Sequence, residues 1–162
     1  DGAIYSIKPE GGSRRVFISG DNFSISPDSR YMAYTLSGGD VAGTKASSFA
    51  YIDMQTGDVT EITRGFNVFN FMWSLDGKKI FYFENRLSGS SDDGEGEEQL
   101  TDEYLYTLWV YYTESGVNKA VADLMSTSII PGRDTDTVYI CYTDKATLGS
   151  VVRATYALNT AQ

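Results

Sequence analysis

The sequence contains no histidine, only one cysteine, Cys141, and only three prolines in 162 residues. Without histidine the chain itself cannot supply Ser-His-Asp or Cys-His catalysis, a histidine-based zinc site or the commonest general base. A single cysteine excludes an internal disulfide, and we interpret Cys141, in the apolar run 138–142, as a small buried side chain and not a nucleophile. No apolar run approaches the roughly 18–20 residues of a membrane span, so we expect no membrane insertion within this chain.

Basic residues are also few. The 13 Lys and Arg are outnumbered by 22 Asp and Glu, which gives a net charge of −9. Nucleic acid binding needs clustered basic side chains that displace counterions, so we expect no nucleic acid partner. The chain begins at Asp1 and not at Met, which we interpret as a processed protein or a segment of a longer one.

What the sequence has in abundance is aromatic and β-branched residues. Aromatics make up 14% of the chain, and twelve of them are tyrosines, which favours strands. Short β-prone segments alternate with clusters of Gly, Asp, Asn and Ser, the pattern of successive antiparallel strands. For residues 119–126 a short helix is the alternative to a strand. The predicted strands span 3–8, 14–19, 23–26, 31–36, 48–54, 59–63, 68–73, 79–84, 105–113, 118–123, 127–130, 137–143 and 151–158.

Part of this pattern is repeated. Ser-Pro-Asp-Ser-Arg-Tyr-Met-Ala-Tyr at 26–34 returns 48 residues later as Ser-Leu-Asp-Gly-Lys-Lys-Ile-Phe-Tyr at 74–82. A period of roughly 20–50 residues is typical of repeat architectures. In both copies we expect the aspartate, Asp28 or Asp76, to accept hydrogen bonds from the backbone ahead of it, and Gly77 to tolerate positive φ. We therefore interpret these aspartates as turn residues and not as catalytic ones.

Together these segments resemble a known family. Residues 23–34, 50–63 and 71–82 are similar to the TolB-type β-propeller repeat, a relative of the WD-type blade. In that repeat an aromatic inner strand, a Ser-Pro-Asp-Gly turn and a second strand precede a third strand that ends in an aspartate and a Thr-Gly turn, here Asp53 and Thr56-Gly57. Residues 4–12 and 108–116 look like further copies, whereas 130–136 departs from the pattern.

The resemblance implies an all-β fold, a partial β-propeller of about three to four four-stranded antiparallel blades. The ring would be completed by a second copy or by missing parts of a longer chain. We predict a partial blade at 1–20, a blade at 21–65, a blade at 66–124 with an acidic insertion at 86–103, and a partial blade at 125–162. The dense aromatics of 66–83 are expected in the core, and one of Tyr111 and Tyr112 is expected to face outward.

In each of the last three blades the connection between the second and third strands is long, at 37–47, 85–103 and 144–150. Antiparallel alternation places these connections on one face, away from the tight turns. Loops on a rigid scaffold often carry binding residues, so we predict binding through this face or through an exposed strand edge. The candidate residues of this face are Asp40, Lys45, Arg86, Asp102, Glu103, Asp144 and Lys145.

The middle connection is strongly acidic, and Ca²⁺ is the ion its carboxylates would take. The spacing does not match the Asp-x-Asp-x-Asp-Gly calcium loop, and a solvated acidic insertion is the favoured interpretation. We therefore predict no cofactor and no catalytic residue in the chain. The weak metal candidates are Asp92, Asp93, Glu95, Glu97 and Glu98.

For function, the resemblance implies a non-enzymatic module that binds a protein, peptide or other ligand in a bacterial extracytoplasmic protein, whether periplasmic, secreted or membrane-tethered. Homodimerisation through strand edges is a further expectation. The alternative is a propeller segment of a larger enzyme, such as a prolyl-oligopeptidase-type serine peptidase, with catalytic residues outside this chain. A third hypothesis, acid–base chemistry by paired carboxylates, has no identifiable pair in the sequence.

Overall fold

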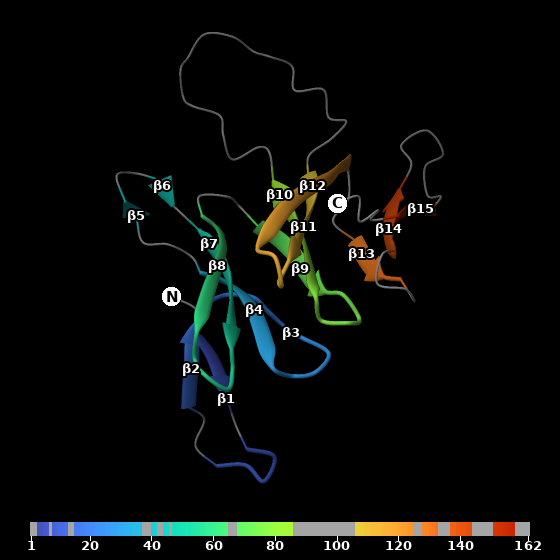
Figure 1. Cartoon of the computed structure of the whole chain (residues 1–162). Coiled ribbons are helices and arrows are strands. Elements are labelled where there is room, and N and C mark those ends of the chain that lie inside the picture. Colours follow the sequence, from blue (N-terminus) through green and yellow to red (C-terminus); the bar gives the residue numbers. More distant parts are fainter. Residues whose placement is uncertain are drawn as a thin grey trace. The chain divides into compact units, whose positions relative to one another are not determined.

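Strands account for all the regular secondary structure in the described part of the chain, shown as a computed structural model in Figure 1. The structure describes residues 3–6, 8–12, 15–36, 40–41, 44–45, 47–64, 68–85, 106–124, 128–132, 137–143 and 151–157. Over these ranges no helix has the length and apolar character needed to cross a bilayer. The strands are β1 (Ala3–Ser6), β2 (Arg15–Ser19), β3 (Phe23–Ile25), β4 (Tyr31–Leu36), β5 (Asp40–Val41), β6 (Thr44–Lys45), β7 (Ser48–Asp53), β8 (Val59–Arg64), β9 (Val68–Trp73), β10 (Lys79–Asn85), β11 (Tyr106–Tyr112), β12 (Val117–Leu124), β13 (Ser128–Pro131), β14 (Thr137–Thr143) and β15 (Val151–Ala157).

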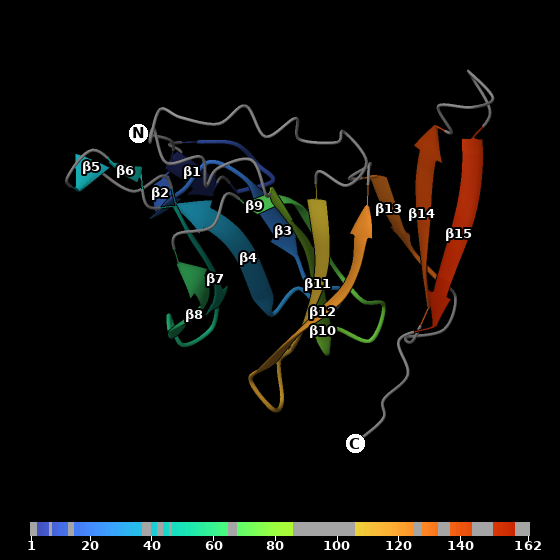
Figure 2. The same ribbon diagram turned by 90° about the horizontal axis from the view of Figure 1, so that it is seen from above.

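These strands form antiparallel sheets in which neighbours follow chain order. Two sheets have four strands, β3-β4-β7-β8 and β9-β10-β11-β12. A three-stranded sheet follows, with β13, β14 and β15 side by side in Figure 2, and β1 pairs with β2. The chain divides into two compact units, Asp1–Phe66 and Asn67–Gln162. The all-β prediction with four-stranded antiparallel sheets is therefore confirmed.

The predicted strands agree with the observed ones, with two differences. The connection 37–47 contains a short hairpin, in which β5 and β6 pair Asp40 with Lys45 and Val41 with Thr44. The alternative of a helix over 119–126 is wrong for 119–124, because this segment forms the edge strand β12 and pairs with β11 along its length. Cross-strand pairing overrides the weak helical preference of Lys119 and its alanine neighbours.

The core of the first unit lies between the β1-β2 pair and the β3-β8 sheet. Met32 and Tyr34 on β4 alternate with residues of the opposite face and stand across from Ile52 and Ala50 on β7. These four side chains cluster with Ile4 of β1. The strand β4 is buried along its centre on both faces, which explains why its sequence is almost continuously apolar.

The core of the second unit is built on β10 and β11. Phe81 and Phe83 on one face of β10 pack with Leu108 and Val110 of β11, together with Leu124 and with Val138 of β14. The predicted aromatic core is confirmed for Trp73, Phe81, Tyr82 and Phe83, which are at most 4% exposed. Of the tyrosine pair, Tyr111 is buried and Tyr112 is half-buried.

Candidate functional site

At one end of each four-stranded sheet, a turn is held by hydrogen bonds among its own serine and aspartate side chains and its backbone amides. In the β3–β4 turn, Ser26 Oγ donates to Asp28 Oδ1 at 2.6 Å, and the same oxygen accepts from Arg30 N at 3.1 Å. Tyr31 N donates to Ser26 Oγ at 2.9 Å. The Ser26 hydroxyl, followed by the Arg30 amide, lowers the pKa of the Asp28 carboxyl.

The β9–β10 turn repeats this geometry. Ser74 Oγ donates to Asp76 Oδ1, Lys78 N donates to the same oxygen at 3.1 Å, and Lys79 N donates to Ser74 Oγ at 2.9 Å. Burial alone would raise the pKa of Asp76, but these hydrogen bonds from Ser74 and Lys78 lower it. The expectation that both aspartates accept from the backbone ahead of them is confirmed, and their role is to fix the turn.

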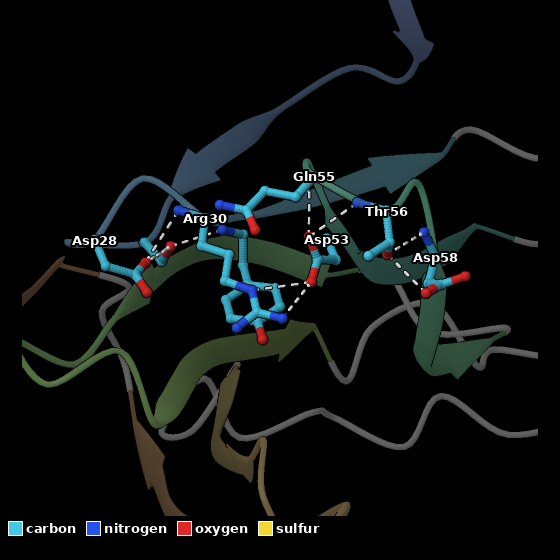
Figure 3. A network of polar contacts seen from close by, with 8 residues as sticks. Asp28, Arg30, Asp53, Gln55, Thr56 and Asp58 are labelled. Atoms are coloured by element: carbon cyan, nitrogen blue, oxygen red, sulfur yellow. Dashed lines mark hydrogen bonds and ion pairs between the residues drawn. The ribbon is translucent and has the colours of Figure 1, made fainter.

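A cation on the first turn reaches the second turn of the same sheet. In Figure 3, Arg30 Nε and Nη2 donate to Asp53 Oδ2 at 3.0 and 2.8 Å. The other oxygen of Asp53 accepts from the backbone of Gln55 at 2.8 Å and of Thr56 at 3.3 Å. The hydrogen bond from Gln55 N, with Arg30 beside it, lowers the pKa of Asp53. The two turns of this sheet are thus tied together.

The corresponding contact in the β9-β12 sheet joins Lys78 Nζ to Glu114 Oε1 at 2.8 Å. Both side chains are more than half exposed, so this ion pair adds little stability. Its position nevertheless matches that of the Arg30–Asp53 pair, because both connect the first turn of a sheet to the second. The turn end of each four-stranded sheet is therefore occupied by structural interactions.

The long connections leave from the opposite end of the sheets, between β4 and β7, β10 and β11, and β14 and β15. For Asp40 and Lys45 the structure describes the backbone, in which they are cross-strand partners, but not the side chains. The Cys141 side chain likewise lies outside the described part. Most residues of the three connections are also outside it, so their gathering on one face remains a prediction. The other predicted residues also lie outside the described residues: Arg86, Asp92, Asp93, Glu95, Glu97, Glu98, Asp102, Glu103, Asp144 and Lys145.

A depression that the sequence did not reveal lies at the end of the β9-β12 sheet from which the acidic insertion leaves. It has a volume of about 400 Å³ and is open to solvent. Glu84 on β10 stands across from Thr107 on β11, and Thr107 stands across from Asp123 on β12. Trp109 follows on the same face of β11. The lining residues are Glu84, Thr107, Trp109, Ala120, Val121, Ala122 and Asp123.

A β-bulge shapes the floor of this depression. Leu108 pairs with Ala122 and Trp109 pairs with Ala120, so Val121 is the extra residue in β12. The bulge breaks the regular alternation of side chains in β12. Ala120, the cross-strand partner of Trp109, has a small exposed side chain and lines the depression.

The Trp109 ring is held in place before any ligand arrives. Its Nε1 donates to Glu84 Oε2 at 2.8 Å, and the Tyr82 ring stacks on it with centroids 6.3 Å apart and planes 10° apart. The Tyr82 hydroxyl accepts a hydrogen bond from Asn118 Nδ2. Burial, more than this hydrogen bond, sets the pKa of Tyr82, which rises to about 12.

Two carboxylates, Glu84 and Asp123, line the depression. Within the described ranges, no three His, Cys, Asp or Glu side chains are grouped so as to hold a metal ion. Thr107 Oγ1 donates to Asp123 Oδ1 at 2.8 Å, which positions one of the two carboxylates of the depression. What the depression offers is an aromatic ring beside two carboxylates, an arrangement suited to binding.

No protein-family model matches the chain, and no curated protein matches it. Solved structures do match at low identity. TolB from Acinetobacter baumannii is 22% identical with a TM-score of 0.56, over 98% of this chain and 36% of that one.

Two peptidase structures are similar to the same degree. The β-propeller domain of the trilobed protease from Pyrococcus furiosus is 18% identical with a TM-score of 0.56, over 94% of this chain and 44% of that one. The acylaminoacyl peptidase of Pyrococcus horikoshii is 19% identical with a TM-score of 0.57, over 88% of this chain and 24% of that one. This chain therefore spans less than half the length of each of these three structures. Its four-stranded antiparallel sheets match partial β-propeller domains, with structural similarity to TolB and to peptidase propellers.

Proposed function

We propose that the chain is a non-enzymatic binding module of a bacterial extracytoplasmic protein and that it binds a protein or peptide partner at the loop-bearing end of its sheets. The observation that carries the proposal is the difference between the two ends of the β9-β12 sheet. One end is closed by the Ser74–Lys79 turn and the Lys78–Glu114 pair. The other end carries the open depression and the long acidic insertion.

The charge of this end favours a basic partner. The sequence contains no Lys or Arg from residue 87 through residue 118, while the same stretch holds the acidic cluster that begins at Asp92. A concentration of one charge sign steers an oppositely charged partner and makes its association sensitive to salt. The similarity to TolB supports the extracytoplasmic setting, which fractionation of the tagged full-length protein tests.

The direct test replaces residues 88–98 with a Gly-Ser segment of equal length. Wild-type and replaced proteins are used to capture partners from an extracytoplasmic extract, and the retained protein is purified for isothermal titration. We expect the replacement to weaken binding and to reduce its salt dependence. The matched control, Lys78→Ala, breaks the Lys78–Glu114 pair at the turn end and should leave binding unchanged. Equal loss in both variants, or retention of no specific partner by the wild type, contradicts the proposal.

Strand-edge association is the competing mode of binding. In the described part of the chain β8, β12 and β15 each form an edge of their sheet. Residues 117–120 of β12 are exposed. An exposed edge can pair with another strand, including one from a second copy. Light scattering tests this mode, because edge-mediated dimers double the mass with rising concentration, whereas partner binding at the loop end leaves the isolated chain monomeric.

A second candidate function is that of a propeller segment in a larger peptidase. The similarity to the trilobed protease and acylaminoacyl peptidase structures favours it. In that case the nucleophile and histidine belong to residues outside this chain. A Gly-x-Ser-x-Gly sequence in the same reading frame, with labelling of the full-length protein by a fluorophosphonate, supports the candidate, and the absence of both contradicts it.

A further inference from the structure

We propose that the depression around Trp109 binds a single cationic side chain, an arginine or lysine of a basic partner. The inference rests on the proposed function in so far as the cation belongs to a protein. The volume of about 400 Å³ lies within the range of ligand pockets, and the depression is open to solvent. The occupant we assign is therefore one side chain and not a docked strand or helix.

Charge selects a cation. Among the described residues that line the depression are two carboxylates, Glu84 and Asp123, and no Lys or Arg. Each carboxylate has two oxygens that together accept about four hydrogen bonds, so the contact from Trp109 leaves acceptor capacity on Glu84. An anion would be repelled here, and a neutral ligand would gain nothing from the charge.

The indole ring supplies the second element of recognition. Tryptophan is the best aromatic partner for a cation, and the attraction grows as the cation loses its water. Trp109 is fixed at its edge by Glu84 and on a face by Tyr82, so little rotamer freedom is lost when a ligand arrives. A planar guanidinium suits an aromatic face and a neighbouring carboxylate at once, which favours arginine over lysine.

The probe that tests the site is acetyl-Gly-Arg-Gly-amide, with its neutral citrulline analogue as matched control. The readout is the indole N–H signal of Trp109 in a ¹H–¹⁵N spectrum, assigned with Trp109→Phe. For one side chain we expect a Kd of about 1 mM. We expect the lysine peptide to bind more weakly, the citrulline peptide not to bind, and the affinity to fall with added salt.

Two variants examine the mechanism without removing the fold. Glu84→Gln keeps an oxygen that accepts from Trp109 Nε1 but removes the charge, and we expect affinity to fall roughly tenfold, the effect of one charge-assisted hydrogen bond. Ala120→Leu fills the depression from an exposed position on β12 and should abolish binding with both carboxylates intact. Glu114→Gln, at the other end of the same sheet, is the control and should change nothing.

The outcomes separate this inference from the proposed function. Absence of any arginine-dependent shift, equal binding of the citrulline peptide, full affinity in Glu84→Gln or a larger shift with a neutral sugar each overturns the cation site. If the probe fails while replacement of 88–98 still abolishes partner binding, the proposed function stands without this site. If the probe binds and no partner is retained, the site stands and the proposed function fails.

Discussion

Ser29 occupies a backbone position that glycine occupies in the second copy of the repeat. Its φ is +59°, and the equivalent Gly77 has φ of +70°. A left-handed backbone costs an ordinary residue about 1–2 kcal/mol, while glycine loses about 0.5–1 kcal/mol more in conformational entropy on folding. The difference predicts that Ser29→Gly stabilises by about 0.5–1 kcal/mol and that Gly77→Ser destabilises by a similar amount.

Chemical denaturation followed by fluorescence or circular dichroism measures both changes, with the m-value held constant as the criterion for a change in stability alone. For a chain of this length 1 kcal/mol corresponds to a shift in Tm of about 2–4 °C. Ser19→Gly is the matched control, because Ser19 lies in β2 outside the positive-φ residues and glycine there should destabilise. A loss of stability in Ser29→Gly, or none in Gly77→Ser, would show that the positive φ of residue 29 does not cost the chain stability.

Other predictions concern the turn network, the core and the stacked tyrosine. Asp53→Asn weakens the contacts with Arg30 and the turn amides, so the midpoint of unfolding should fall, whereas Asp58→Asn on the exposed turn should change it less. The pKa of Asp53 is lowered, so its contribution to stability is present above the unfolded value of about 3.9 and is lost as pH falls through the folded pKa. The difference in free energy of unfolding between the wild type and Asp53→Asn should therefore shrink as the pH falls and vanish in acid. Phe83→Ala should cost about 3–5 kcal/mol, because Phe83 is fully buried, whereas Phe23→Ala, at a side chain 54% exposed, should cost less than about 1 kcal/mol in the same assay. In alkaline spectrophotometric titration Tyr82 should ionise near pH 12, and Tyr82→Phe should remove that step; an unchanged titration curve contradicts the assignment.

The turn chemistry was predictable from the sequence because it depends on residues close together in the chain. Ser74, Asp76 and Gly77 interact within a few positions, so the letters alone indicate which groups meet. The strand pattern was predictable for the same reason, since alternation over a few residues reports burial. The repeated turn then located the four-stranded sheets.

The depression was not predictable because it depends on register across a long insertion. Glu84 and Thr107 are neighbours only because β10 and β11 pair across residues 86–105, and no local pattern fixes that pairing. The bulge at Val121 shifts β12 by one residue and brings Asp123 across from Thr107. The sequence does show a polar residue, Glu84, near the end of β10, and Thr107 and Trp109 two positions apart on β11. These residues indicate a shared site only once the pairing of the two strands is known.

The two ends of the β9-β12 sheet differ, and we propose that a basic partner binds at the end with the depression and not at the turn end. Chemical-shift mapping of the backbone amides with a hexa-arginine peptide distinguishes the two ends. We expect shifts at 84, 107–109 and 120–123 and none at the 74–79 turn. Shifts centred on that turn, or none at the depression, would show that the proposed binding end is wrong.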